Sequence, residues 1–121
     1  MNTLQVSALY LLLEYIWIST MTPRFYKHVF STIQKKPLQP NMLYAIIAYA
    51  LLLMTIVYIC IPLSKTYKYP WLAFGVVGLS IYGIYNCTNK AVFSDYPMDM
   101  VIIDTLWGFI CFSIIGWFYS Q

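Results

Sequence analysis

The sequence predicts an all-α protein: an integral membrane four-helix bundle with an amphipathic interfacial helix in its first loop. Of its 121 residues, 61% are hydrophobic and only 9% are charged, whereas a soluble domain is about 45–50% apolar and about 25% charged. The apolar residues form long unbroken runs, which favours helices over strands. This composition argues against a soluble domain, a disordered chain and a nucleic-acid-binding module, which needs a dense basic patch.

Four membrane helices are expected, in a single transmembrane domain that covers residues 1–121. Each span needs roughly 20 apolar residues, and each is bounded by proline, because proline can begin a helix but interrupts one that is under way. The expected helices are about residues 4–21, 42–61, 71–92 and 98–119, and the bounding prolines are Pro23, Pro40, Pro62, Pro70 and Pro97. Thr22-Pro23 and Pro62 are expected to end the first and second helices.

The first loop, about residues 23–36, has the pattern of an amphipathic helix lying in the membrane interface. Its apolar residues recur at helical spacing: Phe25, Tyr26, Val29, Phe30 and Ile33. The basic residues Arg24, Lys27, Lys35 and Lys36 fall among the polar positions, where cations would meet anionic lipid headgroups. A solvated basic connector is the alternative interpretation.

Basic residues also predict the orientation. The first and third loops carry five lysines and arginines and the loop at residues 63–69 carries two, so the positive-inside rule places the first and third loops in the cytosol and both termini on the opposite side. Asn86-Cys87-Thr88 matches the N-glycosylation pattern. In this orientation we expect no glycan at Asn86.

A few polar residues fall inside the predicted spans. A charge at the centre of a membrane helix costs about 2.5–3.5 kcal/mol, so such residues face the bundle interior and are functional candidates. Glu14 lies about 10 Å from the cytosolic end of its helix, and Asn86 and Asp104 about 9 Å from theirs. We therefore expect one shared polar cluster, with Lys90 as the counter-ion: Glu14, Trp17, Tyr82, Asn86, Thr88, Asn89, Lys90, Asp104 and Trp107.

This cluster has two interpretations, a functional pocket or a structural clamp between helices. Interhelical polar contacts in membranes average only about 0.6 kcal/mol, which makes two acids and a lysine a costly clamp. The three cysteines show no paired spacing and His28 is the only histidine. We therefore expect no metal site, no cofactor and no catalytic residues.

Several of these residues also form a pattern that resembles a known family. The pattern comprises Glu14-x-Ile16-Trp17, Phe25-Tyr26, Tyr44 with Pro62, Tyr82-Gly83-x-Tyr85-Asn86-x-Thr88-Asn89, Pro97 and Asp104-x-x-Trp107-Gly108. It is similar, across nearly the whole chain, to the predicted membrane proteins grouped as domain of unknown function 2177, found in bacteria and large DNA viruses. The resemblance implies a four-helix membrane protein and no known activity. The family usually has aspartate at Asn86 and often at Glu14, which weakens the case for a proton relay.

The leading functional hypothesis is a non-enzymatic structural or scaffolding membrane component. In a viral setting its basic first loop would contact a capsid protein; a second copy of the chain is another expected partner, and nucleic acid is not. The alternative is a small proton- or cation-coupled carrier that uses Glu14 and Asp104. Small multidrug-resistance transporters are similar in size and in a glutamate on the first helix, but the third helix here lacks their glycine-rich pattern. A lipid-modifying enzyme ranks third, because the residues offer no nucleophile.

Overall fold

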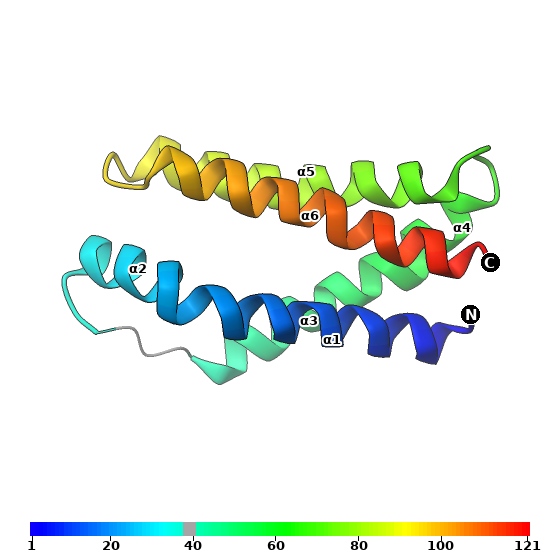
Figure 1. Ribbon diagram of the computed structural model, residues 1–121, viewed down its shortest axis with the longest axis horizontal. Helices are drawn as coiled ribbons and strands as arrows, with labels where there is room; N and C mark the ends of the chain where they lie inside the picture. The colour runs from blue at the N-terminus through cyan, green and yellow to red at the C-terminus, as the bar shows by residue number, and fades with distance from the viewer. Residues whose placement is uncertain (38–40) are drawn as a thin grey trace.

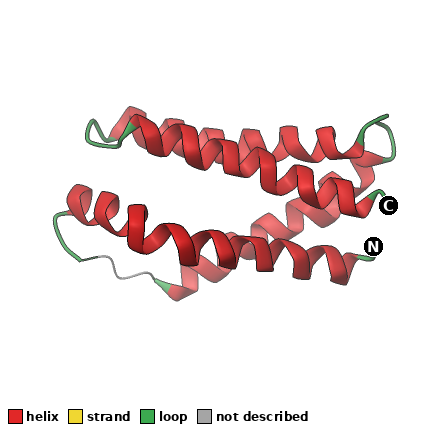
Figure 2. Ribbon diagram, viewed as in Figure 1, coloured by secondary structure: helices red, strands yellow, loops and turns green. Residues whose placement is uncertain are grey.

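A computed structural model describes residues 1–37 and 41–121, which leaves Pro40 outside the described residues. All regular structure in these two ranges is helical, which confirms the predicted fold class (Figures 1 and 2). The elements are α1 (Thr3–Met21), η1 (Thr22–Tyr26), α2 (Lys27–Gln34), α3 (Met42–Thr55), η2 (Ile56–Cys60), α4 (Ile61–Ser64), α5 (Pro70–Val92) and α6 (Met98–Tyr119). They join into four helices long and apolar enough to cross a membrane: Thr3–Gln34, Met42–Ser64, Pro70–Val92 and Met98–Tyr119.

The first helix does not end at Thr22-Pro23, so this expectation is wrong. It starts at an Asn2 capping box and continues for 32 residues, with the π-helical turn η1 between α1 and α2. Pro23 lacks an N–H group and its ring would collide with the carbonyl one α-helical turn earlier. A wider turn, in which the Lys27 N–H donates to the Thr22 carbonyl, accommodates this residue without ending the helix.

The second helix also passes through the proline expected to stop it. Pro62 lies inside α4, and the helix runs on to Ser64. The preceding turn, η2, is π-helical, and the Ile61 N–H donates to the Ile56 carbonyl. Both proline interruptions are therefore absorbed by local widening of the helix rather than by a break.

The amphipathic segment of the first loop is a continuation of α1 instead of a separate helix. Its apolar face packs on protein: Val29 is buried against Tyr96 and Met100, which flank the start of α6. Figure 1 shows α2 (cyan) continuing the line of α1 toward the end of the bundle that carries the α5–α6 loop. An apolar stripe predicts a burial partner but does not distinguish lipid from protein.

The closest helix pair is the antiparallel hairpin of α5 and α6, which pack through small residues (Figure 1). A Cβ added at Gly78 would lie 2.6 Å from Phe112 Cγ, and one at Gly116 would lie 2.8 Å from Phe74. Glycines at such positions let two membrane helices approach closely. The close packing of this hairpin fixes the positions of the polar residues of α5 and α6.

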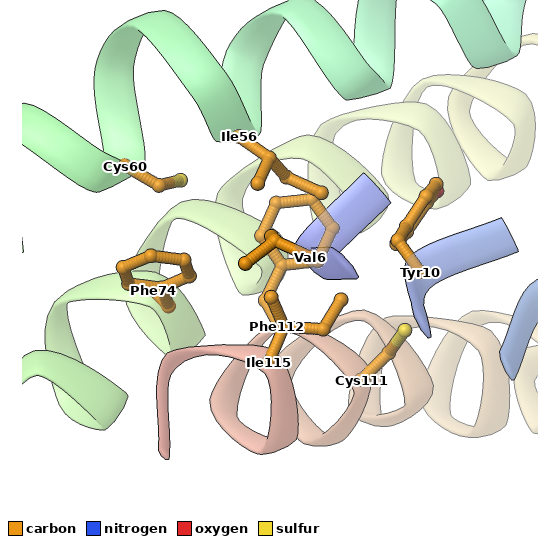
Figure 3. Packing of buried hydrophobic residues seen from close by; sticks show 8 residues of the cluster. All are labelled: Val6, Tyr10, Ile56, Cys60, Phe74, Cys111, Phe112 and Ile115. Atoms are coloured by element: carbon orange, nitrogen blue, oxygen red, sulfur yellow. The ribbon is translucent and has the colours of Figure 1, made fainter. Parts of the chain in front are cut away.

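One apolar core joins the four helices away from the α2 end. Figure 3 shows its buried side chains, which come from α1, η2, α5 and α6: Val6, Tyr10, Ile56, Cys60, Phe74, Cys111, Phe112 and Ile115. The second membrane helix is anchored to this core through η2. In contrast, α3 buries none of its residues.

Candidate functional site

Glu14 is buried inside the bundle and is held by side chains of two other helices. Its Oε1 accepts hydrogen bonds from the Tyr82 hydroxyl at 2.5 Å and from the Trp107 indole N–H at 2.9 Å. The Tyr82 hydroxyl also lies 2.9 Å from the hydroxyl of Tyr10, one turn before Glu14 on α1. The glutamate thus connects α1, α5 and α6. Among the described residues, no hydrogen bond reaches its second oxygen, Oε2.

Asp104 is the second buried carboxyl group, and both of its oxygens are occupied. Oδ1 accepts from the Tyr26 hydroxyl at 2.5 Å, and Oδ2 accepts from Asn86 Nδ2 at 2.6 Å. Tyr26 in turn accepts a hydrogen bond from the indole of Trp17 at 2.6 Å. Asp104 therefore ties α6 to α5 and to the π-helical turn η1.

Asn86 extends this network to the loop between α5 and α6. It is fully buried; its Oδ1 accepts from the Tyr96 hydroxyl at 2.6 Å, and its Nδ2 also donates to the Tyr82 carbonyl at 2.8 Å. Burial raises the pKa of Tyr96, in the loop outside the spans, to about 12. Because the Asn86 side chain is enclosed, the absence of a glycan there would follow in either orientation and does not report which side the loop occupies.

Two tryptophans link the surroundings of the carboxyl groups. The rings of Trp17 and Trp107 stack with centroids 4.4 Å apart and an interplanar angle of 2°. Trp17 lies three residues after Glu14 on α1, and Trp107 lies three residues after Asp104 on α6. These two helices are antiparallel, so each indole lies near the acid of the other helix as well as its own. Trp107 bonds directly to Glu14, whereas Trp17 reaches Asp104 only through the hydroxyl of Tyr26.

Lys90 does not neutralise either acid, so its expected role as counter-ion is wrong. Its Nζ donates to the carbonyl of Tyr96 at 2.8 Å and to that of Ser94 at 3.4 Å, which closes the loop after α5. A long, flexible lysine near a helix end turns toward the polar end of the helix more readily than into the bundle. The hydrogen-bond donors that reach Glu14 and Asp104 are all neutral.

The two acids lie at neighbouring levels instead of the single level expected. Asn86 and Asp104 are each six residues from the loop that joins α5 and α6, about 9 Å. The partners of Glu14 are farther from that loop: Tyr82 is ten residues and Trp107 nine residues away, about 14 Å. A helix end at residue 21 predicts too shallow a position for Glu14, because the first helix continues to Gln34.

The other candidates lie outside the network. Thr88 is exposed and Asn89 is half-buried, and neither hydrogen-bonds to the carboxyl groups or to Asn86. The basic residues of the first loop are all exposed, Arg24 in η1, Lys27 at the start of α2, and Lys35 and Lys36 directly after α2.

Three tyrosines of the network were not among the predicted site residues. The sequence could have indicated Tyr10, because it lies four residues before Glu14 on the same helical face. Tyr96 precedes Pro97 in a loop whose path the sequence does not define. Tyr26 is nine residues after Trp17, about two and a half turns of α-helix, which would put it on the opposite face. The slower winding of η1 changes this phase and brings the two together.

The two carboxyl groups line a cavity of about 680 Å³ between the first helix, α3 and the α5–α6 hairpin. Its wall on α3 is mainly small and aliphatic, with Ala45, Ala48, Leu51 and Leu52, and it also carries the hydroxyl-bearing side chains of Tyr49 and Thr55. Aromatic side chains also line the cavity: Trp17, Tyr26, Phe30, Tyr49, Tyr82 and Tyr85. The volume lies in the range of small-molecule sites, which combine apolar walls with a few polar groups.

Comparisons with known proteins agree with this architecture at the level of family. No curated protein and no solved structure matches the chain. A family model described as "Predicted membrane protein (DUF2177)" matches residues 1–120. The match covers the residues that form the network and the cavity. With four apolar helices long enough to span a bilayer, this is an integral, multi-pass membrane protein, and it belongs to the family of predicted membrane proteins designated domain of unknown function 2177.

Proposed function

We propose that this protein is a small membrane carrier in which Glu14 is the proton or cation site and Asp104 supports it from the same cavity. The observation that carries the proposal is the placement of two buried carboxyl groups on the wall of a cavity within the spans, where every hydrogen-bond donor to them from the described residues is neutral. A carboxyl group can hold a proton or a cation at one time but not both, so a site of this kind can exchange one for the other. The proposal assigns no chemical reaction to the site.

Buried acids in membrane helices usually line ion or substrate pathways, which supports this interpretation. The hydrogen bonds from Tyr82 and Trp107 fix one oxygen of Glu14 and leave Oε2 for a ligand. Asp104 has both oxygens occupied by the protein, so it supplies negative potential to the cavity while Glu14 is the contact group. In the low dielectric of the membrane interior, that potential acts strongly on a nearby cation.

The test is an exchange assay in proteoliposomes that enclose a pH-sensitive dye at acidic pH. Sodium, potassium and a series of organic ammonium salts are added outside, and the rise in internal pH is recorded. We expect at least one cation to accelerate proton exit over empty liposomes, and Glu14→Gln to return the rate to that of empty liposomes. Asp99→Asn, an exposed acid on the same helix as Asp104, is the matched control and retains the rate. Equal rates with and without protein for every cation would overturn the proposal.

A second candidate function, a scaffold that binds an anionic partner, is supported by a different observation. The basic side chains of η1, of α2 and of the two residues after α2 are exposed, while the apolar face of the same segment packs on Tyr96 and Met100. We propose anionic lipid headgroups as their partner on the cytosolic side, the side that the charge distribution of the loops favours. Lys27→Glu combined with Lys35→Glu should weaken binding of the protein in neutral nanodiscs to liposomes that contain anionic lipid. Unchanged binding would refute this candidate and leave the carrier unaffected.

A further inference from the structure

We infer that the ligand of the cavity is a lipophilic amine: a protonated amino group held at Glu14, with an apolar chain lying along the α3 wall. This inference rests on the proposed function and names its substrate class. Three of the four carboxyl oxygens in the cavity already accept hydrogen bonds from the protein. The remaining acceptor, Glu14 Oε2, suits one N–H donor that carries a positive charge.

The walls select against a small hydrated ion. Apart from the two acids, the cavity presents mainly aliphatic and aromatic side chains, and stripping water from an inorganic cation requires several oxygen ligands in place of its hydration shell. Within residues 1–37 and 41–121, one carboxyl oxygen of the cavity, Glu14 Oε2, accepts no hydrogen bond from the protein. An alkylammonium ion needs fewer oxygen ligands in place of its hydration water. Burial of its apolar chain is favourable, and its charged group contacts the carboxyl group and the aromatic rings that line the cavity.

The α3 wall offers a row of small and aliphatic side chains along which an extended chain can lie. Ala45, Ala48 and Leu52 lie at spacings of three and four residues and so share one face of α3, with the two small residues adjacent. We call these three residues the track; Tyr49, Leu51 and Thr55 complete the lining of the cavity on α3. A saturated chain of about eight carbons, roughly 10 Å in extended form at 1.25 Å per carbon, corresponds to about two turns of this helix.

The ligand reaches this cavity from the bilayer, past α3. The core anchors the second membrane helix through Ile56 and Cys60 of η2, whereas α3 buries no side chain. In Figure 1, α3 runs diagonally away from the α5–α6 hairpin toward its N-terminal end. A molecule already dissolved in lipid can therefore enter between α3 and the bundle without crossing water.

The experiment measures binding of octylamine and octanol to the purified full-length protein in nanodiscs. Trp71→Phe and Trp117→Phe are introduced together, so that emission reports on the Trp17–Trp107 pair next to the acids. The two compounds have equal chains and differ in charge. We expect saturable binding of octylamine, and binding of octanol at least about tenfold weaker, because it lacks the charge-assisted hydrogen bond.

Two variants separate the head group from the chain. Glu14→Gln should reduce octylamine binding to the level of octanol. Ala48→Phe fills the track and should weaken binding while leaving the acids in place; Ala50→Phe, on the same helix but facing away from this cavity, should not. Equal binding of octylamine and octanol, or no effect of Ala48→Phe, overturns the inference. If octylamine does not bind while sodium or potassium drives Glu14-dependent proton exit, this inference fails and the proposed carrier function stands.

Discussion

Asn86 offers the most direct test of the network, because one side chain joins α5, α6 and the loop between them. Replacing it with alanine removes hydrogen bonds to Asp104 and to Tyr96. If each is worth the membrane average of about 0.6 kcal/mol, the loss is about 1.2 kcal/mol. If both partners are left unpaired in the interior at about 1.5 kcal/mol each, within the desolvation cost of about 1–3 kcal/mol for such a group, the loss is about 3 kcal/mol.

The free energy of unfolding of Asn86→Ala should therefore fall by about 1–3 kcal/mol. It is measured by titrating sodium dodecyl sulfate into refolded protein in mixed micelles and following helicity and tryptophan emission. Thr88→Ala is the control, since this exposed residue of the same helix lies outside the network, and it should change stability by less than about 0.5 kcal/mol. A loss for Asn86→Ala no larger than for Thr88→Ala would show that the network does not hold these elements together.

Three further predictions follow from the same contacts. Gly108→Ala should destabilise the hairpin by about 1–3 kcal/mol, since its Cβ would lie 2.6 Å from the Tyr82 Cβ, whereas Gly83→Ala, with its nearest contact at 3.4 Å, should be neutral in the same unfolding titration. Because burial raises the pKa of Tyr96 to about 12 from about 10 in an unfolded chain, its contribution to stability is complete below about pH 10 and is lost toward about pH 12; Tyr96→Phe should make this alkaline decline shallower. In a Cys87→Ser background, since Cys87 is itself an exposed free thiol, a Ser94→Cys variant should react with a membrane-impermeant maleimide from the cytosolic side only, and labelling from the opposite side would show that the orientation is reversed.

The fold class and the four spans could be predicted because they depend on composition and run length alone. The start of α6 at Met98 and the end of α5 at Val92 agree with the sequence, since proline or a loop limits each. The continuations past Pro23 and Pro62 could not be predicted in the same way. A proline fixes one backbone angle and removes one donor, and whether the chain then breaks or widens into a π-turn depends on the packing on either side.

The site was predictable where its geometry is local to one helix. Acid and tryptophan three residues apart, and Tyr82 four residues before Asn86, lie on shared faces that the sequence displays. The role of Tyr26 depends on a change of helical phase at η1, and that of Lys90 on the path of the loop after α5. Neither is encoded in the spacing of neighbouring residues. The presence of Lys90 and two acids in the sequence suggests an ion pair. The flexible lysine instead donates its hydrogen bonds to backbone carbonyl groups.

The choice between a clamp and a ligand site turns on what a carboxyl group does here that an amide could not. A glutamine at position 14 could accept the same two hydrogen bonds from Tyr82 and Trp107 through its carbonyl oxygen. It would do so without the cost of placing an ionisable group in a membrane span. A clamp therefore gains little from the acid, whereas a site that holds a proton or a cation requires it. Glu14→Gln should accordingly preserve the fold and the stability of the bundle while removing exchange and amine binding, and a variant that unfolds instead would favour the clamp.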